Sequence, residues 1–250
     1  MTAQRPSFET RLDEVGDNIF RIHTSIPPSL VPGGFSFNQY LIVDEEPMLF
    51  HTGSRALFET VKHAIEKVIP LSKLRYIGFS HYEQDECGSI NSFLAAAPQA
   101  VPVCSAINSM INGDGFDKAP RSLRDGETLT IGKRTLRWLD TPHLPHGWEC
   151  GYIFDELSQT LFCGDLFTQP GSNTPALTQG DILGPSEAMR KQGMDYFAHA
   201  KDTRRMLQRL AELKPGTLAC MHGSTWTGDG APLLLELASV LDGSSNGVTI

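Results

Sequence analysis

The sequence has no long hydrophobic run. None of its apolar stretches approaches the roughly 18 consecutive residues that a membrane-spanning helix needs. Residues 1–14 are polar and lack the apolar core of a signal peptide. We therefore expect neither a membrane partner nor an export signal.

Cysteine is scarce and forms no motif. The five cysteines are widely spaced, without C-x-x-C pairs, and stand at positions 87, 104, 150, 163 and 220. An odd and dispersed set argues against a disulfide framework and for a reducing compartment. We therefore expect a cytoplasmic protein.

Positive charge is also in short supply. The chain has 21 Lys and Arg residues against 29 Asp and Glu, which gives a net charge of −8. The densest basic group is only the pair Arg204 and Arg205. Because binding to phosphates needs clustered basic side chains, this distribution argues against a nucleic-acid partner.

What is present is an interleaved series of strand-like and helix-like segments. With 250 residues and a hydrophobic fraction of 40%, the chain can form one substantial core. Apolar spacing predicts helices over residues 54–69, 89–97, 186–213 (with a break at Gly193) and 232–241. Short apolar runs predict strands at residues 19–22, 40–43, 48–50, 75–79, 100–104, 128–131, 135–139, 151–154, 160–163 and 217–221. This order predicts a single α/β domain over residues 1–250, with helices outside stacked sheets.

The most informative segment is SHYEQDECGS, residues 80–89. His81, Glu83 and Asp85 occupy alternate positions directly after an expected strand. An imidazole and two carboxylates at this spacing can converge on one small volume if the backbone turns there, and Gly88 supports such a turn. We interpret the three residues as candidate metal ligands.

Three further candidates follow other expected strands. His146 comes after the strand at 135–139, Asp165 after the strand at 160–163, and His222 after the strand at 217–221. Strand ends are where α/β folds collect functional side chains. One histidine at such a place is usually an ordinary loop residue, but six ligand-type groups at strand ends favour a shared metal site.

The series H-x-E-x-D, followed by His, Asp and His, resembles the motifs of the metallo-β-lactamase superfamily, over residues 18–224. Most hydrolases of that superfamily have H-x-H-x-D-H, where this sequence has Glu83 and Glu86. In having Glu83 at the first of these places, the sequence resembles the flavodiiron proteins and related oxygen-binding di-iron proteins. The resemblance implies the αββα sandwich of that superfamily, with two mixed β-sheets and outer helices.

The resemblance also implies a two-metal centre. The implied ligands are His81, Glu83 and His146 for one ion, Asp85 and His222 for the second, and Asp165 between the two. The mixed nitrogen and oxygen donors suit two iron ions, with zinc or manganese as alternatives. The candidates for catalytic roles at such a centre are Asp85, Glu86 and His143.

Two residues depart from the superfamily's motifs beside this centre. Glu86 stands where the superfamily has a histidine, so it either binds the second ion or leaves a position open. The motif His-Thr-Gly at residues 51–53 replaces Asp-Thr-Gly. His51 either orients nearby loops, as that Asp does, or is an ordinary loop residue.

A second histidine competes with His146 for the ligand role. His143 lies three residues earlier, close to where the hydrolases of the superfamily have their ligand. The spacing to Asp165 favours His146 as the ligand and makes His143 a residue of the pocket.

The functional expectation is a non-haem di-iron protein that binds or reduces O2, with NO as a further candidate. Flavodiiron proteins carry a flavodoxin domain for which this chain leaves no room, so we expect a separate electron donor, such as a flavoprotein, or oxygen binding without turnover. The rival is a two-metal hydrolase of an ester, thioester or phosphodiester, in which Asp85 orients a metal-bound hydroxide. An oxygen sensor that acts through a partner is a third interpretation, and the sequence leaves a homodimer open.

Overall fold

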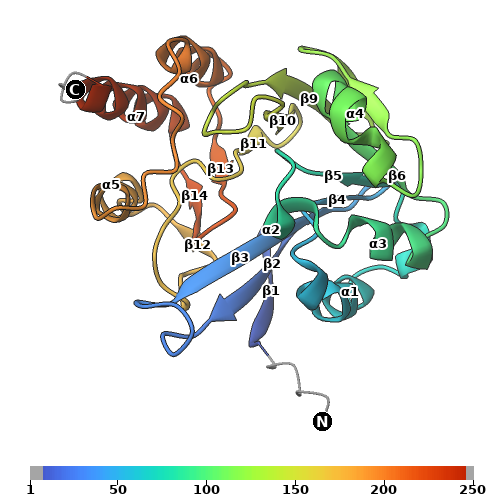
Figure 1. Cartoon of the computed structure of the whole chain (residues 1–250). Helices are drawn as coiled ribbons and strands as arrows, with labels where there is room; N and C mark the ends of the chain where they lie inside the picture. The colour runs from blue at the N-terminus through green and yellow to red at the C-terminus, as the bar shows by residue number, and fades with distance from the viewer. Residues whose placement is uncertain (1–7, 246–250) are drawn as a thin grey trace.

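The computed structural model describes residues 8–245 as two seven-stranded β-sheets with helices outside them (Figure 1). The first sheet contains, in chain order, β1 (Thr10–Gly16), β2 (Ile19–Ile26), β3 (Phe35–Ile42), β4 (Met48–Phe50), β5 (Tyr76–Gly78), β6 (Val101–Ser105) and β7 (Arg121–Leu123). The second sheet contains β8 (Thr128–Thr130), β9 (Thr135–Asp140), β10 (Gly151–Asp155), β11 (Thr160–Phe162), β12 (Leu177–Thr178), β13 (Thr217–Ala219) and β14 (Thr225–Thr227). Each half of the chain therefore builds one sheet.

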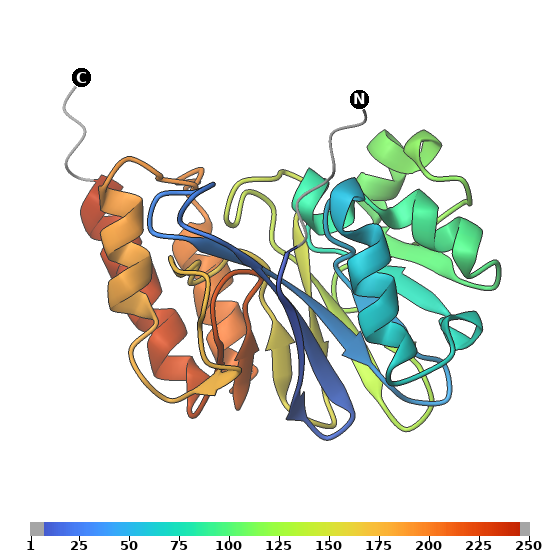
Figure 2. The ribbon, with the colours of Figure 1, turned by 90° about the horizontal axis from the view of Figure 1, so that it is seen from below.

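The helices cover the outer face of each sheet. The first half contributes α1 (Phe58–Glu66), α2 (Gln84–Cys87), α3 (Ile90–Ala96) and α4 (Ala106–Asn112). The second half contributes α5 (Leu183–Lys191), α6 (Thr203–Glu212) and α7 (Gly230–Ser245). Figure 2 shows the two groups of helices on opposite sides of the paired sheets. The predicted αββα sandwich of the metallo-β-lactamase type is confirmed.

The core between the sheets is built from apolar side chains of both halves. Phe162 of β11 has its ring centre 5.5 Å from that of Tyr40 in β3 and 5.7 Å from that of Phe50 in β4. Trp138 of β9 is fully buried in the same cluster. Large buried aromatic rings contribute much of the hydrophobic stabilisation of a core, so these contacts fix the two sheets against each other.

Both sheets are mixed, and their parallel parts direct the chain to one edge. The strands β4, β5, β6 and β7 pair in parallel, and so do β11 and β13. Gly78 ends β5 at a crowded point, where a Cβ atom would collide with Met48 and Phe50. Hydrogen bonds from strand residues to the loops of the other half also join the two halves, from Gly151 N–H to the Ser80 carbonyl (2.9 Å) and from Asn38 N–H to the Met221 carbonyl (2.8 Å).

Several predicted elements differ in extent from those observed. The helix predicted at residues 54–69 is α1, preceded by a 3₁₀ turn at Arg55–Leu57. The helical pattern at residues 186–213 divides into α5 and α6, and Gly193 between them has a φ of 106°, which favours glycine. The elements that the apolar pattern did not predict are β1, β7, β12, β14, α2 and α4. The unpredicted strands have few buried positions, so hydrophobic periodicity could not reveal them.

The cysteines fit the prediction of no disulfide framework. All five lie in the described part of the chain, and all are free and buried. No helix within residues 8–245 combines the length and the apolar character needed to cross a membrane.

Candidate metal centre

The six predicted ligands lie on loops that follow strands at the shared edge of the two sheets. His81 follows β5, and Glu83 and Asp85 come next, where the chain turns into α2. Asp165 follows β11 and His222 follows β13, which are parallel neighbours. His146 lies on the loop that joins β9 to β10. The structure therefore brings all six residues to one place, although their role as ligands stays a prediction.

Four of the side chains form a tight group of donor atoms. Nε2 of His81 lies 2.9 Å from Oε2 of Glu83 and 2.9 Å from Nε2 of His146. Oδ2 of Asp165 is 3.6 Å from the same His81 nitrogen. One donor atom from each of the four residues lies within 4.8 Å of the other three, so one ion could contact them all.

Asp165 also faces a second group. Its other oxygen, Oδ1, lies 3.2 Å from Nε2 of His222, and that nitrogen is 3.6 Å from Oδ2 of Asp85. The two oxygens of one carboxylate therefore point to two sets of donors. This is the arrangement required of a residue that bridges two ions.

Each of the three imidazole rings has a partner at its Nδ1 atom that fixes its orientation. Nδ1 of His146 donates to the Tyr196 carbonyl (2.9 Å), and Nδ1 of His222 donates to the Ser36 carbonyl (2.8 Å). A carbonyl can only accept, so Nδ1 carries the proton and Nε2 presents a lone pair to the group. Nδ1 of His81 lies 3.0 Å from the Ser80 hydroxyl. Ligand histidines of metal sites are commonly oriented through their other ring nitrogen in this way.

These contacts provide a test of whether the residues suit a metal ion. With lone pairs on Nε2 of His146 and His222, the 2.9 Å approach of His81 to His146 needs a proton or a cation between the two rings. Oδ1 of Asp165 is buried and makes no hydrogen bond within residues 8–245. Lone pairs and an unsatisfied carboxylate oxygen that converge on one point fit a cation with nitrogen and oxygen ligands.

The electrostatics of the group are those of closely paired acids and imidazoles. Contacts from His146 and His81 lower the pKa of Glu83 to about 2. Burial alone would lower the pKa of His81 and His222, but the surrounding hydrogen bonds and carboxylates raise both, and contact with Glu83 raises that of His146. Burial would raise the pKa of Asp165, but the adjoining imidazoles lower it below its usual range. Protons and metal ions therefore compete for the same imidazole nitrogens.

Two of the residues predicted to be catalytic lie beside these groups. Burial raises the pKa of Asp85, whose carboxylate adjoins His222. Glu86 is fully buried, with Oε2 2.6 Å from Nε2 of His51 and Oε1 3.9 Å from Nδ1 of His81. Burial, followed by the charge of Asp165, raises the pKa of Glu86. Their catalytic roles stay predictions.

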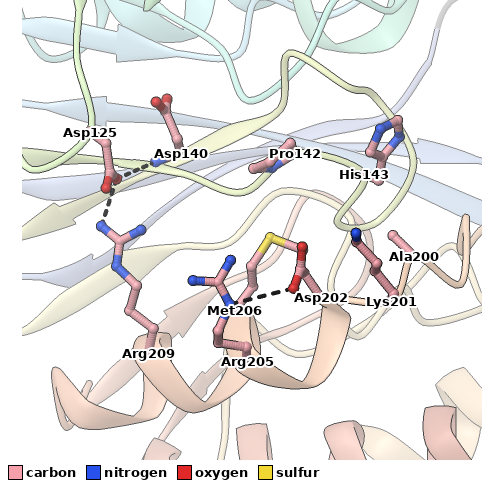
Figure 3. A pocket seen from close by; sticks show the side chains of 10 residues that line it. All are labelled: Asp125, Asp140, Pro142, His143, Ala200, Lys201, Asp202, Arg205, Met206 and Arg209. Atoms are coloured by element: carbon pink, nitrogen blue, oxygen red, sulfur yellow. Dashed lines mark hydrogen bonds and ion pairs between the residues drawn. The ribbon is translucent and has the colours of Figure 1, made fainter.

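His143, the third residue predicted to be catalytic, does not join the group. It is exposed and lines a pocket of about 370 Å³ beside α6, together with Lys201 and Arg205 (Figure 3). Its backbone has a φ of 64°, and its N–H donates to the Gly147 carbonyl (2.8 Å). The structure therefore places His143 in a different pocket from the one expected.

The loop that carries His222 is supported by a buried polar network from the first sheet. The guanidinium of Arg21 and the amide of Asn38 both donate to the Gly223 carbonyl, each at 2.8 Å. Arg21 also donates to the Asn38 side chain (3.0 Å). Sequence analysis missed these two residues, and it missed Ser36 and Tyr196, whose carbonyls orient the ligand candidates. A backbone carbonyl has no side-chain signature, whereas a fully buried arginine within an apolar strand is a signal that could have been used.

With this geometry in place, the comparisons with known proteins can be interpreted. The sequence model of the ODP family beta lactamase matches residues 35–223. The chain belongs to this family. The match runs from the start of β3 to the residue after His222, so it includes all six ligand candidates.

Relatives of this ODP family member include the rubredoxin-oxygen oxidoreductase of Megalodesulfovibrio gigas. It is 26% identical over 212 residues, which cover 80% of this chain and 51% of that protein. The anaerobic nitric oxide reductase flavorubredoxin of Pectobacterium atrosepticum is 24% identical over 213 residues, which cover 80% of this chain and 41% of that protein. The chain thus spans about half or less of the length of these relatives.

Solved structures show the same fold. A fragment of diflavin flavoprotein A 5 from Nostoc sp. PCC 7120 matches with a TM-score of 0.81 and 16% identity, over 96% of this chain and 98% of that one. The flavodiiron protein of Giardia intestinalis matches with a TM-score of 0.78 and 21% identity, over 96% of this chain and 61% of that one. The ODP family fold therefore extends over nearly the whole chain.

Proposed function

We propose that this protein holds two iron ions and binds or reduces O2, with NO as a further substrate. In this proposal His81, Glu83 and His146 bind one ion, Asp85 and His222 bind the other, and Asp165 bridges them. The observation that carries the proposal is Asp165, whose Oδ2 and Oδ1 face two separate sets of imidazole and carboxylate donors.

The chemistry of the donors supports iron over zinc. Three imidazoles and three carboxylates form a mixed set, and carboxylates stabilise the higher charge of ferric ions. A zinc hydrolase site would contain more imidazole. The names of the relatives support the same choice of substrate, because one is an oxygen oxidoreductase and the other a nitric oxide reductase.

The residues of the chain have defined tasks in this proposal. Bound iron supplies the electron-transfer chemistry. The hydrogen bonds from His146 to Tyr196 and from His222 to Ser36 fix the imidazole rings before any ion arrives. The side chains of Glu83 and His146 are 51% and 34% exposed, so a small ligand can reach the centre on their side.

We further propose that electrons come from a separate donor, such as a flavoprotein, and that residues 1–250 form one domain located in the cytoplasm. Five free and buried cysteines support a reducing compartment. The core shared by both sheets supports a single domain, which a single cooperative unfolding transition would test. A homodimer stays open.

Metal analysis combined with anaerobic spectroscopy tests the function. The purified protein is expected to contain two irons per chain and to absorb in the near-ultraviolet and visible range. This absorption should bleach on anaerobic reduction and return when O2 or NO is admitted. Stoichiometric zinc with turnover of an ester, thioester or phosphodiester would contradict the proposal and favour the metallohydrolase.

A further inference from the structure

His51 and Glu86 meet in the interior directly behind the metal centre. His51 follows β4, and Glu86 lies in α2. Both side chains are 0% exposed. Nε2 of His51 lies 2.6 Å from Oε2 of Glu86, slightly closer than the roughly 2.7–2.9 Å of most charged N–H···O hydrogen bonds.

The backbone holds the two residues at this distance. The N–H of Thr52 donates to the Glu86 carbonyl (2.7 Å), and the N–H of His51 donates to the Gly78 carbonyl (2.8 Å). His51 has a φ of 66°, in the left-handed region that few residues other than glycine adopt. The chain therefore accepts local strain at the position from which this imidazole reaches Glu86.

The pair contacts His81 at Nδ1, the ring nitrogen that does not face Glu83 and His146. Ser80 Oγ lies 3.2 Å from Nε2 of His51 and 3.0 Å from Nδ1 of His81, so it links the two rings. Oε1 of Glu86 is 3.9 Å from the same Nδ1. Nε2 of His81 is the nitrogen that faces Glu83 and His146. The pair therefore lies behind the ring of His81, and the predicted ion lies in front of it.

Glu86 has few other ways to offset its burial. Burial raises the pKa of Glu86, and its interaction with the carboxylate of Asp165 raises it further. A buried carboxyl group without a partner is costly, and the close contact with His51 helps to offset this cost. Removal of either partner should therefore alter the position of the other and of the His81 ring.

We propose that His51 and Glu86 act as one buried imidazole–carboxylate unit that holds the ring of His81 from behind. Glu86 is then a positioning residue and not a ligand of either ion. This inference rests on the proposed metal site and adds two residues to its support. Substitution of supporting residues of this kind typically lowers metal affinity by about 10- to 100-fold.

A double-mutant cycle on the full chain tests the unit. His51→Gln, Glu86→Gln and the double variant are loaded with excess iron and then dialysed against increasing chelator concentrations. In excess iron each variant should hold two ions, as the wild type does. Under chelator, each single variant should lose iron about 10- to 100-fold more readily than the wild type. The double variant should lose iron no more readily than whichever single variant loses it more readily, because both substitutions break the same unit.

A matched control separates this effect from simple loss of a buried acid. Asp155, at the far end of β10, is also 0% exposed and pairs with Arg134. Asp155→Asn should lower the melting temperature but leave iron retention and the visible spectrum as in the wild type. The spectrum of His51→Gln should shift although His51 contacts neither ion in this proposal.

Three outcomes would overturn the inference. The first is a Glu86→Gln protein that holds one ion in excess iron, which would make Glu86 a ligand. The second is a His51→Gln protein that retains iron as the wild type does, a result that stands even if the Glu86 variants do not fold. The third is full additivity in the cycle. Failure of the wild type to bind iron would instead reject the proposed function.

Discussion

Among the six ligand candidates, Glu83 is the most exposed and contacts the rings of both His81 and His146. Its carboxylate is half exposed and contacts these two rings, so its substitution should not disturb the core. Glu83→Ala is expected to lower the metal content from two ions per chain to one, as measured by plasma emission after gel filtration. Glu59→Ala, an exposed glutamate on α1, should retain both ions. Two firmly held ions in Glu83→Ala would contradict the ligand assignment.

His143 and His146 provide a matched comparison within one loop. Only His146 turns its Nε2 to the donor group, while His143 lines the pocket beside α6. His146→Ala should lose one ion and most of the visible absorption, whereas His143→Ala should keep both. Equal metal loss in the two variants, measured side by side, would show that the loop matters as a whole and that the ring of His146 does not.

At the residue scale, sequence reasoning picked out side chains that the fold brings together, and their role as ligands stays a prediction. His81, Glu83 and Asp85 were identifiable from their alternate spacing after an apolar run, and the structure brings them to the same place as Asp165. The partner that orients His146 was not identifiable. Tyr196 contributes a carbonyl, which every residue possesses, so its part depends on where the fold places the backbone.

At the scale of elements, the irregular segment between α5 and α6 clamps the loop of His146. Tyr196 accepts from the ring, and the N–H of Ala198 donates to the Pro145 carbonyl (2.7 Å). Asp195 anchors the segment to α5 through an ion pair with Arg190 (2.9 Å). The segment therefore supports the loop of the candidate metal centre and is not merely a connection between helices.

Loosening this segment should weaken one side of the centre. Asp195→Ala is expected to cost about 1 kcal/mol of unfolding free energy, because a charged hydrogen bond to Arg190 is lost. Amide hydrogen exchange of Ala198 should accelerate, and the ion held by His146 should dissociate more readily. Asp202→Ala, which removes a pair with Arg205 at 3.5 Å on the surface, is the control and should change neither. Unaltered exchange in Asp195→Ala would show that Asp195 does not hold this segment in place.

The elements that could be predicted are those with a strong apolar pattern. The break at Gly193 was visible because glycine interrupts a helical pattern. The short helix α2 was not, because its sequence reads as ligands and turn residues, and only four residues adopt the helical form. The edge strand β1 has a single buried residue, Val15, so its pairing with β2 depends on main-chain hydrogen bonds that composition does not reveal.

On the scale of the whole molecule, the stability of the protein should depend on pH through the paired acids and imidazoles. His81, His146 and His222 have pKa values raised above the ordinary 6.5. In the metal-free protein their contribution to stability is therefore complete below about pH 6.5 and is lost as the pH rises through the raised values. Glu83, with a pKa lowered from 4.5 to about 2, acts oppositely, since its contribution is lost as the pH falls towards 2.

Removal of the metal should therefore lower the melting temperature more at higher pH. Protons compete with the ions for the imidazoles, so the gain in melting temperature on iron loading should increase from pH 6 to pH 8. Calorimetry of the iron-loaded and chelator-stripped protein at pH 6, 7 and 8 would measure this gain. A gain that is constant or that shrinks with pH would mean that these imidazoles do not bind the ions.

The placement of the donors on both sheets has a consequence for how the protein is made. The first half of the chain supplies His81, Glu83 and Asp85, and the second half supplies His146, Asp165 and His222. A nascent chain cannot complete the second set of donors until His222 has emerged from the ribosome and β13 has taken its place beside β11. Uptake of the second ion would then report that β13 has joined its sheet, and a chain arrested before that point would have no way to retain the pair of ions.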